Sequence, residues 1–391
     1  MCVALATVFT WCAFAGRLGR TGLTAPIVFV AVGFVLAEVF DAPDLGAEPE
    51  LVMLIAEVTL VWVLFGDAAG VRWRAFRRDL GTYGRLLGIG LPLTVALGTG
   101  AAVVVLGLDP WPALLVGAAL APTDAALGAG VMSDPRVPDA VRRALNVESG
   151  LNDGIVTPVV LVAIAGTAVD EGIAGVGGPG LAVLSLLVGV AAGAVVGALG
   201  AWCTRRAREL GWLRDELDGI AVLALALLAY ALALLVDGNG FVAAFVAGLV
   251  FGNVAGDRRE QEVTLVAQSG DLASMISWLV FGALAVPVVL ERWSWTVLAY
   301  AALSLTLVRM LPVALSLLGA GFGRYPVAFI GWFGPRGLAS VIFALLALEG
   351  LGDDGLEVVA VISLTVLVSV LVHGFSAGPL ARRFPDVLRT G

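Results

Sequence analysis

The sequence predicts an all-α polytopic membrane protein with about 13 transmembrane helices. Hydrophobic residues make up 60% of its 391 residues and charged residues only 14%, against roughly 25% charged residues in an average soluble domain. Apolar runs of about 20 residues, long enough to cross a bilayer as a helix, recur from one end of the chain to the other. They lack the period-two alternation of membrane β-strands.

Thirteen apolar segments can be drawn between short connections that contain Gly, Pro, Asp or Arg. They cover residues 1–16, 24–40, 50–66, 83–107, 111–132, 141–166, 179–204, 217–236, 240–256, 264–290, 294–320, 325–348 and 355–381. The first segment lacks the basic start of a signal peptide, so we expect it to be a true first helix. We expect one membrane transporter unit over residues 1–391, without a soluble regulatory domain.

The basic residues predict the orientation of these segments. Every basic residue is an arginine, and 20 of the 23 follow odd-numbered segments. They are Arg17, Arg20, Arg72, Arg74, Arg77, Arg78, Arg85, Arg136, Arg142, Arg143, Arg205, Arg206, Arg208, Arg214, Arg258, Arg259, Arg324, Arg382, Arg383 and Arg389. Because positively charged connections stay in the cytoplasm, we expect the amino terminus outside and the carboxyl terminus inside the cell membrane.

The segments divide into two sets of six, joined by a linker helix at 264–290, that enter the membrane from opposite sides. This arrangement is typical of two inverted repeats. The fifth segment contains Pro122, and its counterpart, the twelfth, contains Pro335. Proline removes a hydrogen-bond donor and clashes with the preceding turn, so each segment is expected to unwind there or to kink. A pair of interrupted helices indicates a binding site near the middle of the bilayer.

The segment 179–204 carries Gly189, Gly193 and Gly197 at four-residue spacing. Small residues at this spacing let a second helix approach closely. Two interpretations remain open, a surface between two copies of the chain and tight packing within one copy.

Polar residues gather on the segment 141–166, where carboxylates cost free energy unless they face a cavity or a partner. Glu148, Ser149, Asn152 and Asp153 fall at i, i+1, i+4 and i+5, within one wide helical face. A hard monovalent cation prefers such oxygen ligands. A partly buried carboxylate also takes up a proton near neutral pH. One site that binds either a cation or a proton is sufficient for exchange.

Each polar residue also has a structural interpretation. Glu148 is expected to form a salt bridge with Arg309, and Asn152 could be a hydrogen-bonding residue between helices. Thr123 and Asp124 could cap the second half of the interrupted segment. Asp124 would complement the positive ends of half-helices, as Arg336 would complement negative ends on the segment 325–348.

Three further polar residues allow two interpretations each. Glu57 and Asp67, on and just after the segment 50–66, could line an ion funnel, although an acid at the interface is often merely solvated. His373, the only histidine, could be a proton relay. A packed or interfacial histidine is the alternative.

Five stretches of the chain resemble the sodium/proton exchanger family of the cation:proton antiporter group. They are Pro122-Thr123-Asp124, Glu148 to Gly154, Val308-Arg309, Phe333 to Gly337, and Val372 to Phe375 leading into Pro379 to Arg383. The resemblance implies a homodimer in which the unwound fifth and twelfth segments cross. It also implies a core transport domain at approximately 83–166 and 294–381 that slides against a dimerisation domain at approximately 1–66 and 179–256.

The same resemblance implies roles for single residues. Asp153 would be the carrier carboxylate, with Thr123, Ser149 and Asp124 lining the site for Na⁺. The family's buried acid–arginine pair maps onto Glu148 and Arg309. The Asn152-Asp153 pair resembles the electroneutral branch, which trades one cation for one proton. One departure is that many relatives have a glutamate where this chain has Gly66 followed by Asp67.

We therefore expect a secondary active antiporter, not an enzyme, that exchanges Na⁺ or Li⁺ for H⁺ and needs no cofactor besides these transported ions. A K⁺/H⁺ antiporter on the same scaffold is the alternative. An intramembrane hydrolase would need a nucleophile and base, or two aspartates at matched depth. No GxSxG or zinc motif is present in the sequence. A third possibility is a sensor that binds the ion without moving it. Binding of the cation together with an absence of flux would support this function.

Overall fold

The computed structural model describes residues 2–18, 23–40, 49–71, 79–132, 134–173, 178–255 and 259–384. Every regular element within these ranges is a helix, as the sequence predicts. Eight helical stretches in this part of the chain are long and apolar enough to cross a bilayer, and four shorter apolar helices accompany them. The chain forms two compact units, one of residues 1–52, 81–152 and 275–391 and one of residues 53–80 and 153–274.

Three long helices run from one unit into the other. They are α3 (Pro49–Gly70), α9 (Asp139–Asp170) and α13 (Arg259–Arg292). Apart from Leu80, the first residue of α5 (Leu80–Arg85), each of the remaining helices lies within one unit.

The first unit begins with α1 (Cys2–Leu18) and α2 (Ala25–Phe40). It continues with α5 (Leu80–Arg85) and α6 (Leu91–Ala101), which π-helical turns at Leu86–Gly90 and Ala102–Leu106 join and extend. The others are α7 (Pro110–Ala119), α8 (Ala125–Met132), α14 (Trp295–Leu305), α15 (Leu307–Ser316), α16 (Arg324–Trp332), α17 (Leu338–Leu351) and α18 (Leu356–Arg382).

Three predicted segments of this unit are interrupted helices. Residues 120–124 separate α7 from α8, and residues 333–337 separate α16 from α17. Pro122 and Pro335 lie in these two stretches, in agreement with the expectation that proline unwinds the helix there. A third interruption at Thr306, between α14 and α15, was not predicted. Its backbone leaves the helical region at φ −111° and ψ −90° without a proline or glycine beside it.

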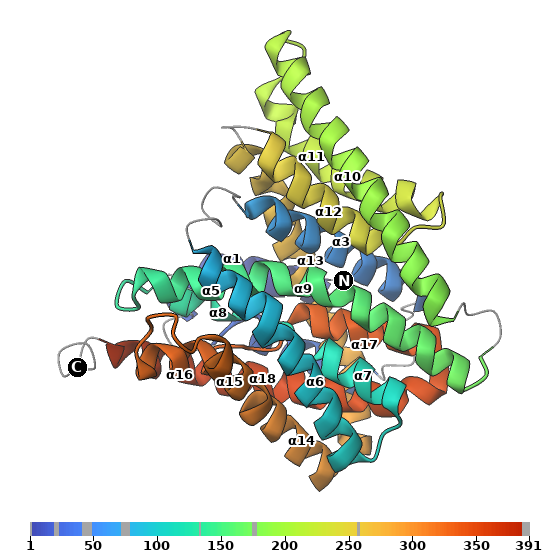
Figure 1. Ribbon diagram of the computed structural model, residues 1–391, viewed down its shortest axis with the longest axis vertical. Helices are drawn as coiled ribbons and strands as arrows, with labels where there is room; N and C mark the ends of the chain where they lie inside the picture. Colours follow the sequence, from blue (N-terminus) through green and yellow to red (C-terminus); the bar gives the residue numbers. More distant parts are fainter. Residues whose placement is uncertain are drawn as a thin grey trace. The chain divides into compact units, whose positions relative to one another are not determined.

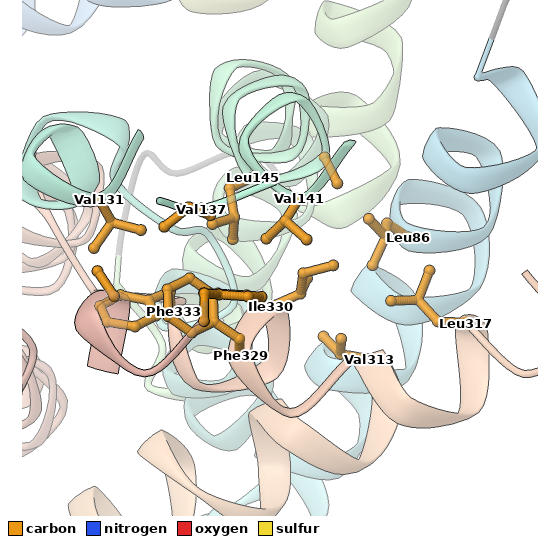
Figure 2. Packing of buried hydrophobic residues seen from close by; sticks show 13 residues of the cluster. Leu86, Val131, Val137, Val141, Leu145, Val313, Leu317, Phe329, Ile330 and Phe333 are labelled. Carbon is orange, nitrogen blue, oxygen red and sulfur yellow. The ribbon is translucent and has the colours of Figure 1, made fainter. Parts of the chain in front are cut away.

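An apolar cluster holds one end of the first unit together (Figure 2). The rings of Phe329 in α16 and Phe333 just after it lie with centroids 4.4 Å apart, and the ring centroid of Phe384 lies 4.6 Å from that of Phe329. Side chains from α8, α9 and α15 surround these rings, including Val131, Val141 and Val313. Burial of several large apolar side chains at about 1.5–3 kcal/mol each fixes α16 against the start of α9.

The second unit contains α10 (Pro179–Glu209), α11 (Asp218–Leu234) and α12 (Gly240–Val254), which pack against one another (Figure 1). The glycines at 189, 193 and 197 of α10 are buried. A Cβ atom at Gly193 would lie 2.3 Å from the carbonyl oxygen of Ala243, and one at Gly197 would lie 2.5 Å from that of Ala247. The glycine spacing therefore allows tight packing of α10 against α12 within one chain, which is one of the two interpretations.

Part of the basic pattern lies outside the described residues, namely Arg20, Arg72, Arg74, Arg77, Arg78, Arg258 and Arg389, and the side chain of Arg259. Among the described arginines, Arg136 pairs with Asp134 at 2.6 Å. Arg208 forms an ion pair with Glu262 of α13 and lies 3.4 Å from Asp218 of α11. The two contacts of Arg208 join the end of α10 to the starts of α11 and α13 in the second unit.

Gly193→Ala should destabilise the second unit, because the new methyl group would meet backbone rather than a side chain that can move aside. We expect a loss of about 1–3 kcal/mol, seen as a lower midpoint of thermal unfolding in detergent. Gly180→Ala on the same helix is the matched control, since nothing lies within 4 Å of its Cβ position. Equal midpoints for the two variants would contradict the packing described.

Candidate functional site

Helix α9 positions the polar residues that the sequence singles out. Glu148, Ser149 and Asn152 are 1%, 3% and 0% exposed, and Asp153 is 8% exposed. Polar groups are this deeply buried only when hydrogen bonds or ligands compensate the lost water. The hydrogen-bond partners of these side chains therefore indicate the role of this helix face.

Thr123 brings the interrupted stretch 120–124 against α9. The Thr123 hydroxyl oxygen lies 2.9 Å from that of Ser149 and accepts a hydrogen bond of 2.8 Å from Nδ2 of Asn152. The other amide atom, Oδ1 of Asn152, is buried and has no hydrogen-bond partner in the described part of the chain. Three of the predicted site residues thus gather with one uncompensated oxygen among them.

Asp124 caps two helices at once. Its Oδ1 accepts a hydrogen bond of 3.3 Å from the backbone N–H of Leu127 in α8, and its Oδ2 accepts one of 3.0 Å from Leu338 in α17. Its own backbone N–H donates to the carbonyl of Pro335 at 2.8 Å. A carboxylate at two helix N-termini satisfies free N–H groups and complements both dipoles. The cap of α8 was expected from the sequence, and the cap of α17 was not.

Arg336 plays the complementary role to Asp124, because its positively charged guanidinium donates hydrogen bonds to backbone carbonyl groups. Its Nη1 donates to the carbonyl oxygens of Ala121 at 2.7 Å and Pro122 at 3.2 Å, just after α7 ends. Its Nη2 donates to the carbonyl of Ser304 at 3.3 Å, next to the interruption at Thr306. The first two carbonyl groups lie in the stretch that follows α7, and the third belongs to α14. None of them belongs to the segment 325–348 that carries Arg336.

Glu148 and Arg309 form a buried, bidentate ion pair. Nη1 of Arg309 lies 2.6 Å from Oε1 of Glu148, and Nη2 lies 2.8 Å from Oε2. Both side chains are 1% exposed. Two parallel charge-assisted hydrogen bonds are the strongest arrangement available to such a pair. The pair joins α15 to α9 one turn from Asn152.

Asp153 follows Asn152 without a break in helix α9. Ser149 and Asp153 are four residues apart and so share one face of the helix. The next residue, Gly154, lets α12 approach, since a Cβ there would lie 2.2 Å from the ring of Phe245. The helix backbone at Asp153 is further held by the Thr157 hydroxyl, which donates to the Asp153 carbonyl at 2.7 Å.

The other predicted acids lie elsewhere on the helices. Glu57 and Asp67 are both on α3 in the second unit, and both are partly exposed. Within the described ranges, no three His, Cys, Asp or Glu side chains come together as they would around a resident metal ion. The oxygens that do gather in the first unit come from Thr, Ser and Asn, which suits a weakly held ion better than a permanent one.

A cavity of about 420 Å³ lies beside the first two turns of α9. It is lined by Met132, Asp139, Arg142, Arg143 and Asn146. Asn146 precedes Ser149 by three residues and Asp153 by seven, so these residues follow one another along one face of the helix. The cavity therefore lies on the same helix face as the buried polar residues.

Sequence reasoning missed Ser304, Ser340 and Ser369. The Ser340 hydroxyl donates to the carbonyl of Ala119 at 2.6 Å, and Ser369 accepts the backbone N–H of Arg336 at 2.7 Å. Only Ser369 had a signal in the sequence, since it lies four residues before His373 and so one helical turn away. A lone serine in an apolar helix usually bonds to its own helix, which is why the others gave none.

Comparisons with known proteins place this geometry in a family. A family model described as "Sodium/hydrogen exchanger, transmembrane" matches residues 3–383. The chain is 29% identical over 374 residues to the K(+)/H(+) antiporter NhaP of Alkalimonas amylolytica, over 93% of this chain and 63% of that protein. It is 28% identical over 368 residues to the K(+)/H(+) antiporter NhaP2 of Shewanella sp. (strain MR-4), with the same shares. The chain thus spans 63% of the length of these curated relatives.

Among solved structures, the fold is similar to that of the sodium proton antiporter MjNhaP1 from Methanocaldococcus jannaschii at pH 8. The TM-score is 0.79 at 20% sequence identity, over 98% of this chain and 97% of that one. At 20% sequence identity, this structural similarity establishes the fold alone. Because the family model covers residues 3–383, the chain is an integral membrane protein that belongs to the sodium/hydrogen exchanger family.

Proposed function

We propose that the chain is a secondary active antiporter that exchanges a monovalent cation for H⁺ by alternating access. The observation that carries the proposal is the buried group of Thr123, Ser149 and Asn152, with the amide oxygen of Asn152 left uncompensated beside them. A buried oxygen without a donor costs free energy, and a cation that binds there removes that cost. Membership of the exchanger family supports the same activity.

In this proposal Asp153 binds the cation and the proton in competition. Asp153 and Ser149 share a face of α9, and Thr123 is tied to that face by two hydrogen bonds. Asp124 contributes less directly, because both of its oxygens already accept backbone N–H groups. One carboxylate that carries either one cation or one proton moves the same charge in both directions. The exchange is therefore electroneutral, with one ion traded for one proton.

The proposal extends to the architecture. The stretches 120–124 and 333–337 exchange hydrogen bonds, which supports two interrupted helices that cross between two inverted six-helix repeats. The core transport domain at 83–166 and 294–381 would then move against the dimerisation domain at 1–66 and 179–256 of a homodimer. The amino terminus would lie outside the cell membrane. The cavity at Asn146 would connect the site with the cytoplasm, and Glu57 and Asp67 would line the funnel.

Na⁺, with Li⁺ as a close substitute, is the cation that we propose. K⁺ is the second candidate, because the curated relatives NhaP and NhaP2 are described as K(+)/H(+) antiporters. The two candidates differ in the size of the coordination shell that hydroxyl and amide oxygens must provide. The cation dependence of exchange in proteoliposomes, with Na⁺, Li⁺ and K⁺ tested separately, decides between them.

Asp153→Asn should abolish exchange, because an amide can neither bind a proton nor neutralise a cation. The measurement is dequenching of a pH-sensitive dye in proteoliposomes after addition of the cation. Asp170→Asn is the matched control, since Asp170 lies at the far end of the same helix with an exposed side chain. Normal exchange by the Asp153 variant would contradict the assignment of the carrier.

The rate of exchange should not depend on membrane voltage, because the carrier crosses with the same charge whichever ion it holds. A gradient of a lipophilic ion sets the voltage across the proteoliposome membrane, because K⁺ is itself a candidate substrate, with a Na⁺ gradient driving exchange. A rate that changes steeply with the imposed voltage would refute the ratio of one cation to one proton.

Arg309→Met should destabilise the protein strongly, because it leaves the Glu148 carboxylate buried without its partner. Breaking such a pair costs about 3–5 kcal/mol, so the midpoint of thermal unfolding should fall. Replacing both residues, Glu148→Leu with Arg309→Met, should restore much of that stability. If the double variant also keeps exchange activity, the pair is structural, as we propose; loss of exchange in a stable double variant would mean that Glu148 takes part in transport.

A further inference from the structure

His373 of α18 lies against the stretch 333–337, which separates α16 from α17. Its ring is buried, and it is packed beside the aromatic ring of Trp332 with centroids 5.4 Å apart. Ser369, one turn earlier on α18, is fully buried as well. Neither side chain belongs to the group around Thr123, so their role needs a separate explanation.

A chain of three hydrogen bonds runs through these two residues, from the backbone of Arg336 to that of Trp332. The backbone N–H of Arg336 donates to the Ser369 hydroxyl oxygen at 2.7 Å. The same oxygen lies 3.0 Å from Nδ1 of His373. At the far side of the ring, Nε2 lies 2.9 Å from the carbonyl oxygen of Trp332. The chain of contacts begins and ends on the backbone at the two ends of residues 332–336.

The chemistry of the partners determines where the protons are. A carbonyl oxygen only accepts, so Nε2 of His373 must carry a proton. The Ser369 oxygen accepts from Arg336 and keeps its own hydrogen to donate to a bare Nδ1. A neutral ring with its proton on Nε2 therefore satisfies each of these groups.

A doubly protonated ring is the competing arrangement, since the Ser369 carbonyl oxygen lies 2.9 Å from Nδ1 and could accept a proton there. The charged groups that act on the ring are Arg336 and Arg309, both cations. Glu148 is already paired with Arg309, so a further positive charge on the buried ring would be repelled by the two guanidinium groups and would be unfavourable. The surroundings favour the neutral ring.

The interrupted stretch in turn holds the candidate cation ligands. Pro335 accepts the backbone N–H of Asp124, and Leu338 donates to its carboxylate. The Arg336 guanidinium holds the carbonyl groups of Ala121 and Pro122, which directly precede Thr123. Any shift of residues 333–337 relative to α18 would pass through these bonds to the Thr123 hydroxyl.

We propose that His373, as a permanently neutral ring, and Ser369 are positioning residues that anchor the stretch 333–337 to α18 and so set the place of Thr123 for the cation. The two residues neither touch the cation nor carry the transported proton. Both ring nitrogens are already engaged, which leaves the ring no free position for passing a proton on. The kinetic consequence rests on the proposed antiport, whereas the protonation state does not.

The protonation state can be measured on the wild-type chain in lipid bilayers. His373 is the only histidine, so labelling histidine with ¹⁵N reports on this ring alone. We expect solid-state NMR to show a protonated Nε2 and a bare Nδ1 at every pH at which exchange is active. A doubly protonated ring, or a neutral ring with its proton on Nδ1, would overturn the proposal whether or not the chain transports ions.

The positioning role is tested by variants in proteoliposomes. His373→Ala and Ser369→Ala should each raise the KM for the cation by about tenfold, the effect of one lost buried hydrogen bond, with a smaller change in kcat. His373→Gln should recover most of the affinity, because its amide donates to the Trp332 carbonyl and accepts from Ser369. Its dependence on pH should remain that of the wild type.

Two results would contradict the positioning role. One is an unchanged KM in both alanine variants. The other is a His373→Gln variant that exchanges as slowly as His373→Ala and whose exchange rate has a pH dependence shifted from that of the wild type. That result would make His373 a proton relay. If His373→Ala does not fold, the KM of Ser369→Ala still tests the positioning role, and the NMR measurement still tests the protonation state. Absence of exchange by the wild type would instead refute the proposed function and leave the NMR prediction standing.

Discussion

A backbone that leaves the helical conformation inside a bilayer loses its own hydrogen-bond partners, and lipid offers no water to replace them. The structure of the first unit is organised around this constraint. Three predicted segments are interrupted, at residues 120–124, at Thr306 and at residues 333–337. One carboxylate, Asp124, accepts one N–H group from each of two half-helices, α8 and α17. One guanidinium, Arg336, donates to carbonyl groups just after α7 and in α14.

These caps explain why the candidate site lies where it does. Thr123 sits between the residue whose carbonyl is held by Arg336 and the residue that caps α8 and α17. Its hydroxyl is therefore placed by backbone on both sides before it meets Ser149 and Asn152 of α9. The Glu148–Arg309 pair fixes α9 against α15 one turn away. These neighbours on each side hold the three neutral polar groups that we propose as ion ligands.

The sequence predicted the parts of this arrangement that depend on local chemistry. Pro122 and Pro335 marked two interruptions because proline cannot continue the hydrogen-bond ladder. The spacing of Glu148, Ser149 and Asn152 marked one face of α9, and the family resemblance paired Glu148 with Arg309. Thr306 gave no signal, since Leu305-Thr306-Leu307 reads as ordinary apolar helix. The second cap made by Asp124 and the bonds from Arg336 to Ala121 and Pro122 could not be predicted, because they join residues more than 200 positions apart.

The central claim is that a cation and a proton compete for the same carboxylate, Asp153. The most direct test is the KM for Na⁺ measured at a series of pH values in proteoliposomes, with the maximal rate recorded at each. Competition predicts that on the acid side the KM rises by about tenfold per pH unit, because linkage is reciprocal, while the maximal rate at saturating cation stays constant. A maximal rate that falls as the pH is lowered, with a constant KM, would contradict the account, since the proton would then act at a site other than the one that binds the cation.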